Sequence, residues 1–241
     1  MLRRGGETTG GRGRPLLLRR ADDRSLPTTG ATWMELTRIA TGATVFALTW
    51  REAKAVELPA WEEPTFRAIN QLPETGRLLW PVMQFGSFAA IPVVTVALDR
   101  LTGDRRFAAT VGAAGLAAYL GAKVVKRRVG RGRPGDVYET INRRENASGY
   151  GYPSGHAAEA AAMATVIASR LPRSWQWLPV ALVTSVSTGR LFFGAHLPHD
   201  VIGGAAMGTL IGGSLNLAHR AVPVRRSIAP VSLVPRPEAG A

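Results

Sequence analysis

The stretch Tyr152-Pro153-Ser154-Gly155-His156 stands directly before an alanine-rich apolar run at residues 157–168. Ser154 is a natural helix N-cap, because its hydroxyl can accept a hydrogen bond from an amide of the first turn. The free amides and the positive dipole end of such a helix favour a bound anion, and Gly155 lets that anion approach the backbone closely. His156 would then lie beside the anion, where an imidazole can exchange a proton near neutral pH. A plain turn with an incidental histidine would produce the same pattern, so the rest of the chain has to decide between the two.

Apolar segments on both sides of this stretch predict an all-α fold, a six-helix transmembrane bundle. A helix of about 20 residues crosses a hydrocarbon core of about 30 Å. The first span is the weakest, because Glu35 and Arg38 lower the hydropathy of the segment, and an interfacial helix is the alternative there. A kink is expected at Pro92 in the second span. The six expected spans are 34–50, 79–98, 107–125, 155–169, 176–191 and 198–218.

The segments outside the spans divide the chain into three parts. We expect residues 1–32 to form a disordered basic tail, residues 33–218 the membrane-embedded domain, and residues 219–241 a mobile C-terminal tail. Residues 51–78 are polar and amphipathic, which predicts a helix and a loop lying on the membrane surface.

Glycines recur at four-residue spacing in the last span, at Gly204, Gly208 and Gly212. Such a ridge lets a neighbouring helix approach closely. We therefore expect a packing face there, without chemistry.

The composition restricts the function and the location. The 241 residues carry a net charge of +13 and no cysteine, which excludes disulfides and thiolate metal sites. All six tryptophans fall near the ends of the expected spans, as they do in the aromatic belts of membrane proteins. The positive-inside rule places both termini and two short loops in the cytoplasm, so we expect a multi-pass protein of the cell membrane. Those loops carry Arg100, Arg105, Arg106, Arg170 and Arg173.

The six-span count brings polar residues from three segments to one face of the membrane. The loop 127–153 and the connection 192–197 would both lie on the outer side. Three cations, a helix N-terminus, two histidines and one aspartate would meet there, which suits phosphoryl transfer because that reaction depends on positioning and charge stabilisation. Arginine binds phosphate oxygens in pairs and lysine acts as a point charge. The residues are Lys126, Arg133, Ser154, Gly155, His156, Arg190, His196 and Asp200.

These residues form three motifs, Lys126-x6-Arg133-Pro134, Pro153-Ser154-Gly155-His156 and Arg190-x5-His196-x3-Asp200. Their order and spacing resemble the signature of the type 2 phosphatidic acid phosphatase family. This family is part of the lipid phosphate phosphatase and vanadium haloperoxidase superfamily, and the resemblance covers about residues 75–218. Gly189 is a departure, since the family usually has serine there. That serine supplies at most a supporting contact, so we expect activity without it.

The resemblance implies a metal-independent hydrolase that acts on a lipid phosphate or pyrophosphate through a phosphohistidine. His196 would be the nucleophile, and Asp200 would hold its other ring nitrogen. His156 would protonate the leaving group and then activate water. No cofactor or metal is implied, because cations supply the charge. The phosphate-binding groups would be Lys126, Arg133, Arg190 and the backbone at Ser154 and Gly155.

The resemblance leaves the substrate open among phosphatidic acid, phosphatidylglycerol phosphate and a polyprenyl pyrophosphate. The oligomeric state is also open. A haloperoxidase-like vanadate site and a catalytically silent lipid-phosphate-binding membrane protein are the alternatives. The arginines fall in tails and at span ends rather than on one compact face, so we expect no nucleic-acid partner.

Simpler explanations exist for individual residues. Lys126 and Arg133 could anchor span ends at the interface, and His196 and Asp200 could cap the last helix. His199 could join them in a metal cluster, although the spacing fits no common site.

Other charges in these segments have no role in the three motifs. Glu159, inside a span, could pair with an arginine of the site or tune His156. The remaining loop arginines are expected to attract anionic head groups. They are Arg127, Arg128, Arg131, Arg143 and Arg144.

Overall fold

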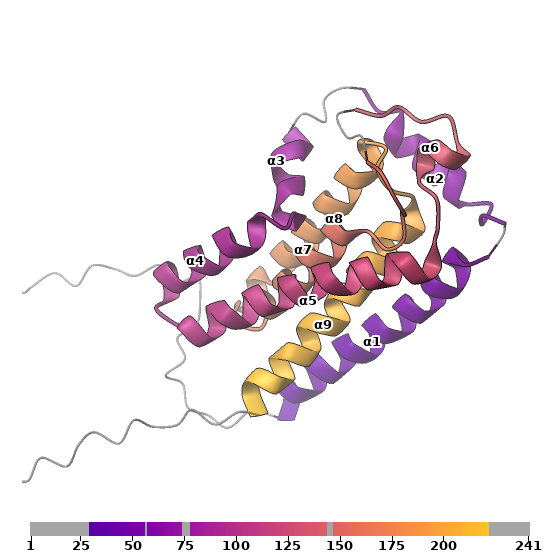
Figure 1. Cartoon of the computed structure of the whole chain (residues 1–241). Helices are drawn as coiled ribbons and strands as arrows, with labels where there is room; N and C mark the ends of the chain where they lie inside the picture. Colours follow the sequence, from indigo (N-terminus) through magenta and orange to yellow (C-terminus); the bar gives the residue numbers. More distant parts are fainter. Residues whose placement is uncertain (1–28, 56, 74–77, 144–146, 222–241) are drawn as a thin grey trace, which may run out of the picture.

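The computed structural model describes residues 29–55, 57–73, 78–143 and 147–221 (Figure 1). This part of the chain is helical and contains no β-strand, which confirms the all-α prediction. Helices lie at all six positions where the sequence predicts spans. In chain order the elements are α1 (Thr29–Ala53), α2 (Glu62–Asn70), α3 (Leu79–Met83), η2 (Gln84–Gly86), α4 (Ala90–Thr102), α5 (Arg105–Val129), α6 (Pro134–Val137), α7 (Gly155–Ala168), η3 (Arg173–Trp175), α8 (Trp177–Phe192) and α9 (Pro198–Ala221).

Helix α7 forms the centre of the bundle and packs against α5, α8 and α9. Eleven of its 14 residues are buried, most of them alanines. Alanine has the best helix propensity, and its small side chain lets neighbouring helices approach from several sides. The alanine-rich run after Ser154 therefore becomes the element around which the others pack.

The glycine ridge of α9 packs on α7, as predicted. A Cβ added at Gly204, Gly208 or Gly212 would collide in each case with a main-chain oxygen of α7 or of its N-cap. These oxygens belong to Ser154, Ala158 and Ala162. The ridge thus lets α9 place its first turn directly beside the start of α7.

The second expected span is not one helix. The pair α3–η2 meets α4 at an angle of 84°, and the break lies at residues 87–89 rather than at Pro92. Gly86 explains the position, because a Cβ there would collide with the main-chain oxygen of His156. The chain turns where it contacts the start of α7, and an apolar run does not reveal that contact.

Helix α1 is longer than predicted and includes residues 29–32, which were expected to belong to the tail. Its Glu35 is fully buried and forms ion pairs with Arg38 at 2.9 Å and with Arg220 of α9 at 3.4 Å. The charges that weaken this span in the sequence are therefore neutralised inside the bundle. Helix α9 includes Arg220 and is described as far as Ala221, beyond the predicted end at residue 218.

Fewer helices have the dimensions of a full membrane crossing than the six predicted. Within the described residues, two stretches are long and apolar enough, Arg105–Val137, which begins with α5, and Pro198–Ala221. The bent pair of α3–η2 and α4 makes a third if its two arms count as one span. α7 and α8 have 14 and 16 residues, short of the roughly 20 that a straight crossing takes.

We call the end of the bundle where α5 and α8 end and α7 and α9 begin the site end, and the opposite end the far end. The short helices α2 and α6 lie together at the site end (Figure 1). Helix α2 falls within the segment predicted as a surface helix and loop, but Glu62 and Phe66 on it are fully buried.

Candidate active site

The structure brings the three predicted motifs together at the site end. Lys126 lies in the last turn of α5, and Arg133 is the N-cap of α6. Ser154 caps α7, while Gly155 and His156 begin that helix. Arg190 lies in the last turn of α8, His196 lies in the connection that follows, and Asp200 lies in the first turn of α9.

His196 and Asp200 form the most deeply buried pair of the site. The Nδ1 atom of His196 lies 3.3 Å from Oδ2 of Asp200, and the two side chains are 2% and 0% exposed. The same carboxylate oxygen accepts a hydrogen bond from the amide of Leu197 at 2.9 Å. When Nδ1 carries the ring proton toward Asp200, Nε2 keeps its lone pair, which is the state a nucleophilic histidine needs.

Three cations act on this imidazole. Burial, together with the positive charges of Arg190, Lys126 and Arg133, holds the pKa of His196 well below its ordinary value. The ring is therefore neutral at pH 7. The same three cations also act electrostatically on His156. The arrangement places concentrated positive charge around His196 and His156, as an anionic substrate would require.

Hydrogen bonds fix the cations of the first motif against the other two segments. Lys126 Nζ donates to the oxygen of Tyr150 at 2.9 Å. Nη1 of Arg133 donates at 2.6 Å to the main-chain oxygen of Ala195, the residue directly before His196. Its Nε donates to the oxygen of Gly149 at 2.9 Å. The loop after α5 is thus tied to the segment that carries His196.

The start of α7 is fixed from both directions. Ser154 Oγ accepts from the amide of Ala157 at 3.4 Å, and the Ser154 amide donates to the oxygen of Asp200 at 2.8 Å. The predicted N-cap is confirmed. Gly155 and His156 remain partly exposed beside it, so the bare first turn is accessible to an anion.

Glu159 lies one turn deeper in α7 and is 3% exposed. Within the described residues its Oε2 has no hydrogen-bond partner, and the pairing with a site arginine or the tuning of His156 stays a prediction.

Arg131 is a buried residue of the site end that the sequence interpretation assigned wrongly. It was expected to be a solvated loop charge, but it is 8% exposed. Its Nη1 donates to Oδ1 of Asp200 at 3.0 Å and to Oε1 of Glu62 at 3.1 Å, and its Nη2 donates to Oε2 of Glu62. Gly130 before it has a φ of 70°, which ends α5 and turns the chain toward the site.

Glu62 is the second residue that the sequence did not identify. Burial would raise its pKa, but hydrogen bonds from His199 and Arg131 and the Arg131 charge lower it to about 2. The amide of His199 donates to Oε1 of Glu62 at 2.9 Å. A glutamate at the start of an amphipathic helix gives no local signal of such a partner.

His199 does not form the metal cluster considered as an alternative. Its ring packs against Trp61 at 4.8 Å between centroids, and its Nδ1 lies 3.3 Å from Glu62 without hydrogen-bond geometry. Across the described ranges, no group of three or more His, Asp or Glu side chains could hold a metal ion.

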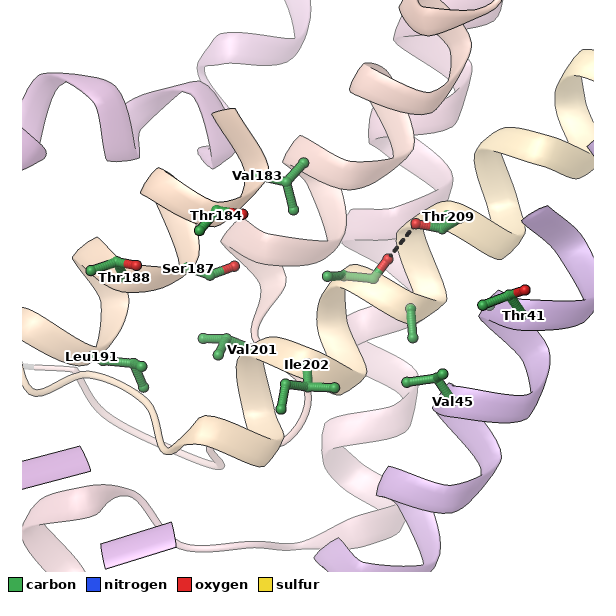
Figure 2. Close-up of a pocket in the computed structure, with 13 residues that line it drawn as sticks. Thr41, Val45, Val183, Thr184, Ser187, Thr188, Leu191, Val201, Ile202 and Thr209 are labelled. Carbon is green, nitrogen blue, oxygen red and sulfur yellow. Dashed lines mark hydrogen bonds between the residues drawn. The ribbon is translucent and has the colours of Figure 1, made fainter. Parts of the chain in front are cut away.

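An apolar pocket of about 390 Å³ lies beside the cationic cluster, between α1, α8 and α9. Figure 2 shows its lining, with Thr184 and Thr188 on α8, Ile202 on α9 and Val45 on α1. At one end, its walls include Leu191 and Val201, which directly follow Arg190 and Asp200 in the sequence.

A second pocket of about 430 Å³ has a polar lining. Arg133 and Gly194 contribute to its wall, together with Asp136, Glu139 and Ser148 from the loop between α5 and α7.

A family model described as the PAP2 superfamily matches residues 107–223. Over this segment, just under half of the chain, the sequence is similar to the PAP2 superfamily. The matched segment contains all eight predicted site residues, whereas Glu62 and α2 precede it. The PAP2 motifs thus account for the cations and histidines, and the carboxylate behind Arg131 comes from a part of the chain outside the match.

Curated relatives and solved structures show further similarities. Decaprenylphosphoryl-5-phosphoribose phosphatase from two strains of Mycobacterium tuberculosis, CDC 1551 / Oshkosh and ATCC 25618 / H37Rv, is 34% identical over 110 residues. The match covers 45% of this chain and 59% of the relatives, so the chain spans less than two thirds of their length.

Two solved structures share the fold with a TM-score of 0.62 each. One is a transmembrane PAP2-type phosphatidylglycerolphosphate phosphatase from Bacillus subtilis, 19% identical, where the match covers 77% of this chain and 99% of that one. The other is Aquifex aeolicus LpxE, 20% identical, with 68% and 99% covered. At these identities the likeness concerns the fold alone.

Proposed function

We propose that the protein hydrolyses a phosphate monoester or pyrophosphate carried by a lipid, through a phosphohistidine on His196. The observation that carries the proposal is the buried, neutral His196 beside Asp200, surrounded by Lys126, Arg133 and Arg190. Nε2 of His196 attacks phosphorus, and the bond to the leaving oxygen breaks while His156 donates a proton to that oxygen. Water then attacks the phosphohistidine, His156 takes its proton, and inorganic phosphate leaves.

The proposal includes catalysis without a metal, because three cations and the first turn of α7 can neutralise the phosphoryl oxygens. The substrate class we favour is a polyprenyl-linked phosphate, since the curated relatives act on a decaprenyl compound. Phosphatidic acid and phosphatidylglycerol phosphate remain in the test panel, because no contact in the site selects against a glycerolipid.

The test is phosphate release by the detergent-purified protein in EDTA. The panel holds phosphatidic acid, phosphatidylglycerol phosphate, a polyprenyl pyrophosphate, a polyprenyl-phosphoryl sugar phosphate and a soluble aryl phosphate. Release that survives EDTA and disappears in His196→Ala supports the mechanism, and the ranking names the substrate class. A folded protein that releases phosphate from none of them contradicts the proposal and favours a silent lipid-phosphate-binding protein.

We further propose that the apolar pocket between α1, α8 and α9 holds part of the lipid chain. Thr184→Phe should fill it and raise KM for lipid substrates while leaving the aryl phosphate unaffected. Val180→Phe is the matched control, because Val180 lies one turn away on α8, is 66% exposed and does not line the pocket. Equal effects of both variants on lipid turnover would contradict this assignment.

The site is proposed to face the outside of the cell membrane, with both termini in the cytoplasm. The chain has no cysteine, so single cysteines report topology directly. Asn142→Cys at the site end should react with an impermeant maleimide in intact cells, and Ser174→Cys at the far end should not. The reverse labelling pattern would invert the orientation.

A further inference from the structure

We propose that Arg131 and Glu62 are positioning residues that hold Asp200 against the nucleophile His196. The proposal rests on the function proposed for His196. Within the described residues, the hydrogen bonds of the Arg131 side chain go to Glu62 and to Asp200, so its role would be exerted through Asp200.

The two oxygens of Asp200 have separate partners. Oδ2 faces His196 at 3.3 Å and accepts from the amide of Leu197, whereas Oδ1 accepts from Arg131 at 3.0 Å. A carboxylate bonded on both oxygens has a fixed rotation about its last torsion. Arg131 thus determines which oxygen faces the imidazole, and its charge stabilises the negative charge of a fully buried aspartate.

Arg131 is itself fixed by Glu62. Both of its terminal nitrogens donate to that carboxylate, which gives the paired geometry typical of strong arginine–carboxylate contacts. Glu62 also accepts from the amide of His199, the residue directly before Asp200. One glutamate therefore positions both the guanidinium on Asp200 and the backbone that carries Asp200.

Helix α2, which supplies Glu62, is anchored at its other end as well. The side-chain amide of Asn70 donates to the oxygens of Ile141 at 3.0 Å and Phe192 at 3.1 Å. Phe66, between the two anchors, packs in a buried cluster with Leu191 and Leu197. The helix is therefore held over the segment that carries His196, and it gives Glu62 a rigid base.

Stability alone does not account for this cluster. Taking charges out of water costs about as much as their pairing returns, so a buried ion-pair triad adds little net stability. A cluster of two carboxylates and one guanidinium, all at most 6% exposed in their side chains, does supply a fixed geometry beside a histidine that becomes positively charged when it carries the phosphoryl group.

The experiment compares kcat and KM for phosphate release in Arg131→Met and Glu62→Gln with matched controls. Arg105→Met is one control, because Arg105 begins α5 at the far end and is exposed, so the change removes one positive charge away from the site. Glu63→Gln is the other, because Glu63 is the neighbour of Glu62, is exposed and pairs only with Arg67 within the described residues. Rates are divided by the folded fraction, measured from thermal unfolding.

We expect Arg131→Met to lower kcat about 100-fold, the loss typical of a misplaced catalytic group, with KM changed less than about threefold. Glu62→Gln should lose less, because an amide oxygen can still accept from Arg131 and from His199. Arg131→Lys should recover part of the loss by restoring the charge. Both controls should keep the wild-type kcat per folded molecule.

If wild type is active and Arg131→Met keeps its kcat per folded molecule, the positioning role is wrong while the proposed function stands. If Arg131→Met does not fold, Glu62→Gln and Arg131→Lys decide, and an unchanged kcat in both overturns the role. A wild-type protein that releases phosphate from no member of the panel overturns the proposed function and this role together.

Discussion

The two ends of the bundle each contain a fully buried glutamate held by arginines, and they differ in what the glutamate is attached to. Glu62 at the site end is bonded on both oxygens and connects through Arg131 to Asp200. Glu35 at the far end binds Arg38 and Arg220 through Oε1, while its Oε2 has no hydrogen-bond partner within the described residues. Buried ion pairs alone therefore do not identify a catalytic end. The site end differs because His196 lies against Asp200, whereas His219 at the far end contacts Thr110.

The largest contrast should come from the two histidines at opposite ends. His196→Ala should lower turnover at least about 10³-fold, because the nucleophile is removed. His219→Ala at the far end should leave turnover unchanged, since His219 contacts Thr110 and no site residue. Phosphate release in detergent checks both variants, and near-native turnover in His196→Ala would refute the assigned nucleophile.

The next contrast lies between two lysines one turn apart on α5. Lys126→Ala should weaken binding of substrate and vanadate roughly 30-fold or more, the cost typical of losing one member of a buried charged contact. Lys123→Ala should have little effect, because Lys123 is exposed and lies over the ring of Tyr119. Inhibition constants for vanadate measure this directly. Equal losses in both variants would indicate a general effect of charge rather than a specific phosphate contact.

Acid should reduce the difference in stability between wild type and Glu62→Gln. Because the folded pKa of Glu62 is about 2 and its ordinary value is 4.5, ionised Glu62 stabilises the fold fully above about pH 4.5. This contribution, on the order of 3 kcal/mol, is lost as the pH falls from 4.5 toward 2. Thermal unfolding measured from pH 6 to pH 3 should show that the difference in unfolding free energy between wild type and Glu62→Gln becomes smaller as the pH falls. A gap independent of pH would mean that the Glu62 charge does not stabilise the fold.

The smallest effect is expected next to Arg190. A Cβ at Gly189 would lie 3.4 Å from Cβ of Met83, an ordinary contact, so Gly189→Ser should fit and change kcat less than about threefold. Steady-state kinetics of this variant show whether the missing serine matters. A gain of tenfold or more would mean that the serine supplies more than a supporting contact.

Much of the fold could be predicted because its signals are local. The N-cap at Ser154, the alanine run after it and the glycine ridge of α9 each act within a few residues or by small side-chain size alone. The predicted positions of the helices followed from such signals. The prediction of the second span as one helix was wrong, because its break depends on a contact between Gly86 and the backbone of His156, which lies 70 positions away.

The candidate site likewise contains residues that the sequence identified and residues that it did not. The motif residues were identified because their chemistry and spacing are specific, and the helix ends bring them to one place. Arg131 and Glu62 were missed because an arginine in a basic loop and a glutamate on an amphipathic helix both resemble solvated charges. Arg131 lies 69 positions from Glu62 and 69 from Asp200, so nothing local distinguishes it from Arg127 or Arg128.

The sequence by itself determined where the helices lie and which side chains can handle a phosphoryl group, because caps, helix propensities and side-chain chemistry are properties of short segments. Only the tertiary structure decided which charges leave water. Which charges are buried depends on how α2 and the loop after α5 pack over the start of α9. Burial there makes an unpaired charge costly, so a carboxylate from a distant helix becomes the partner of a loop arginine.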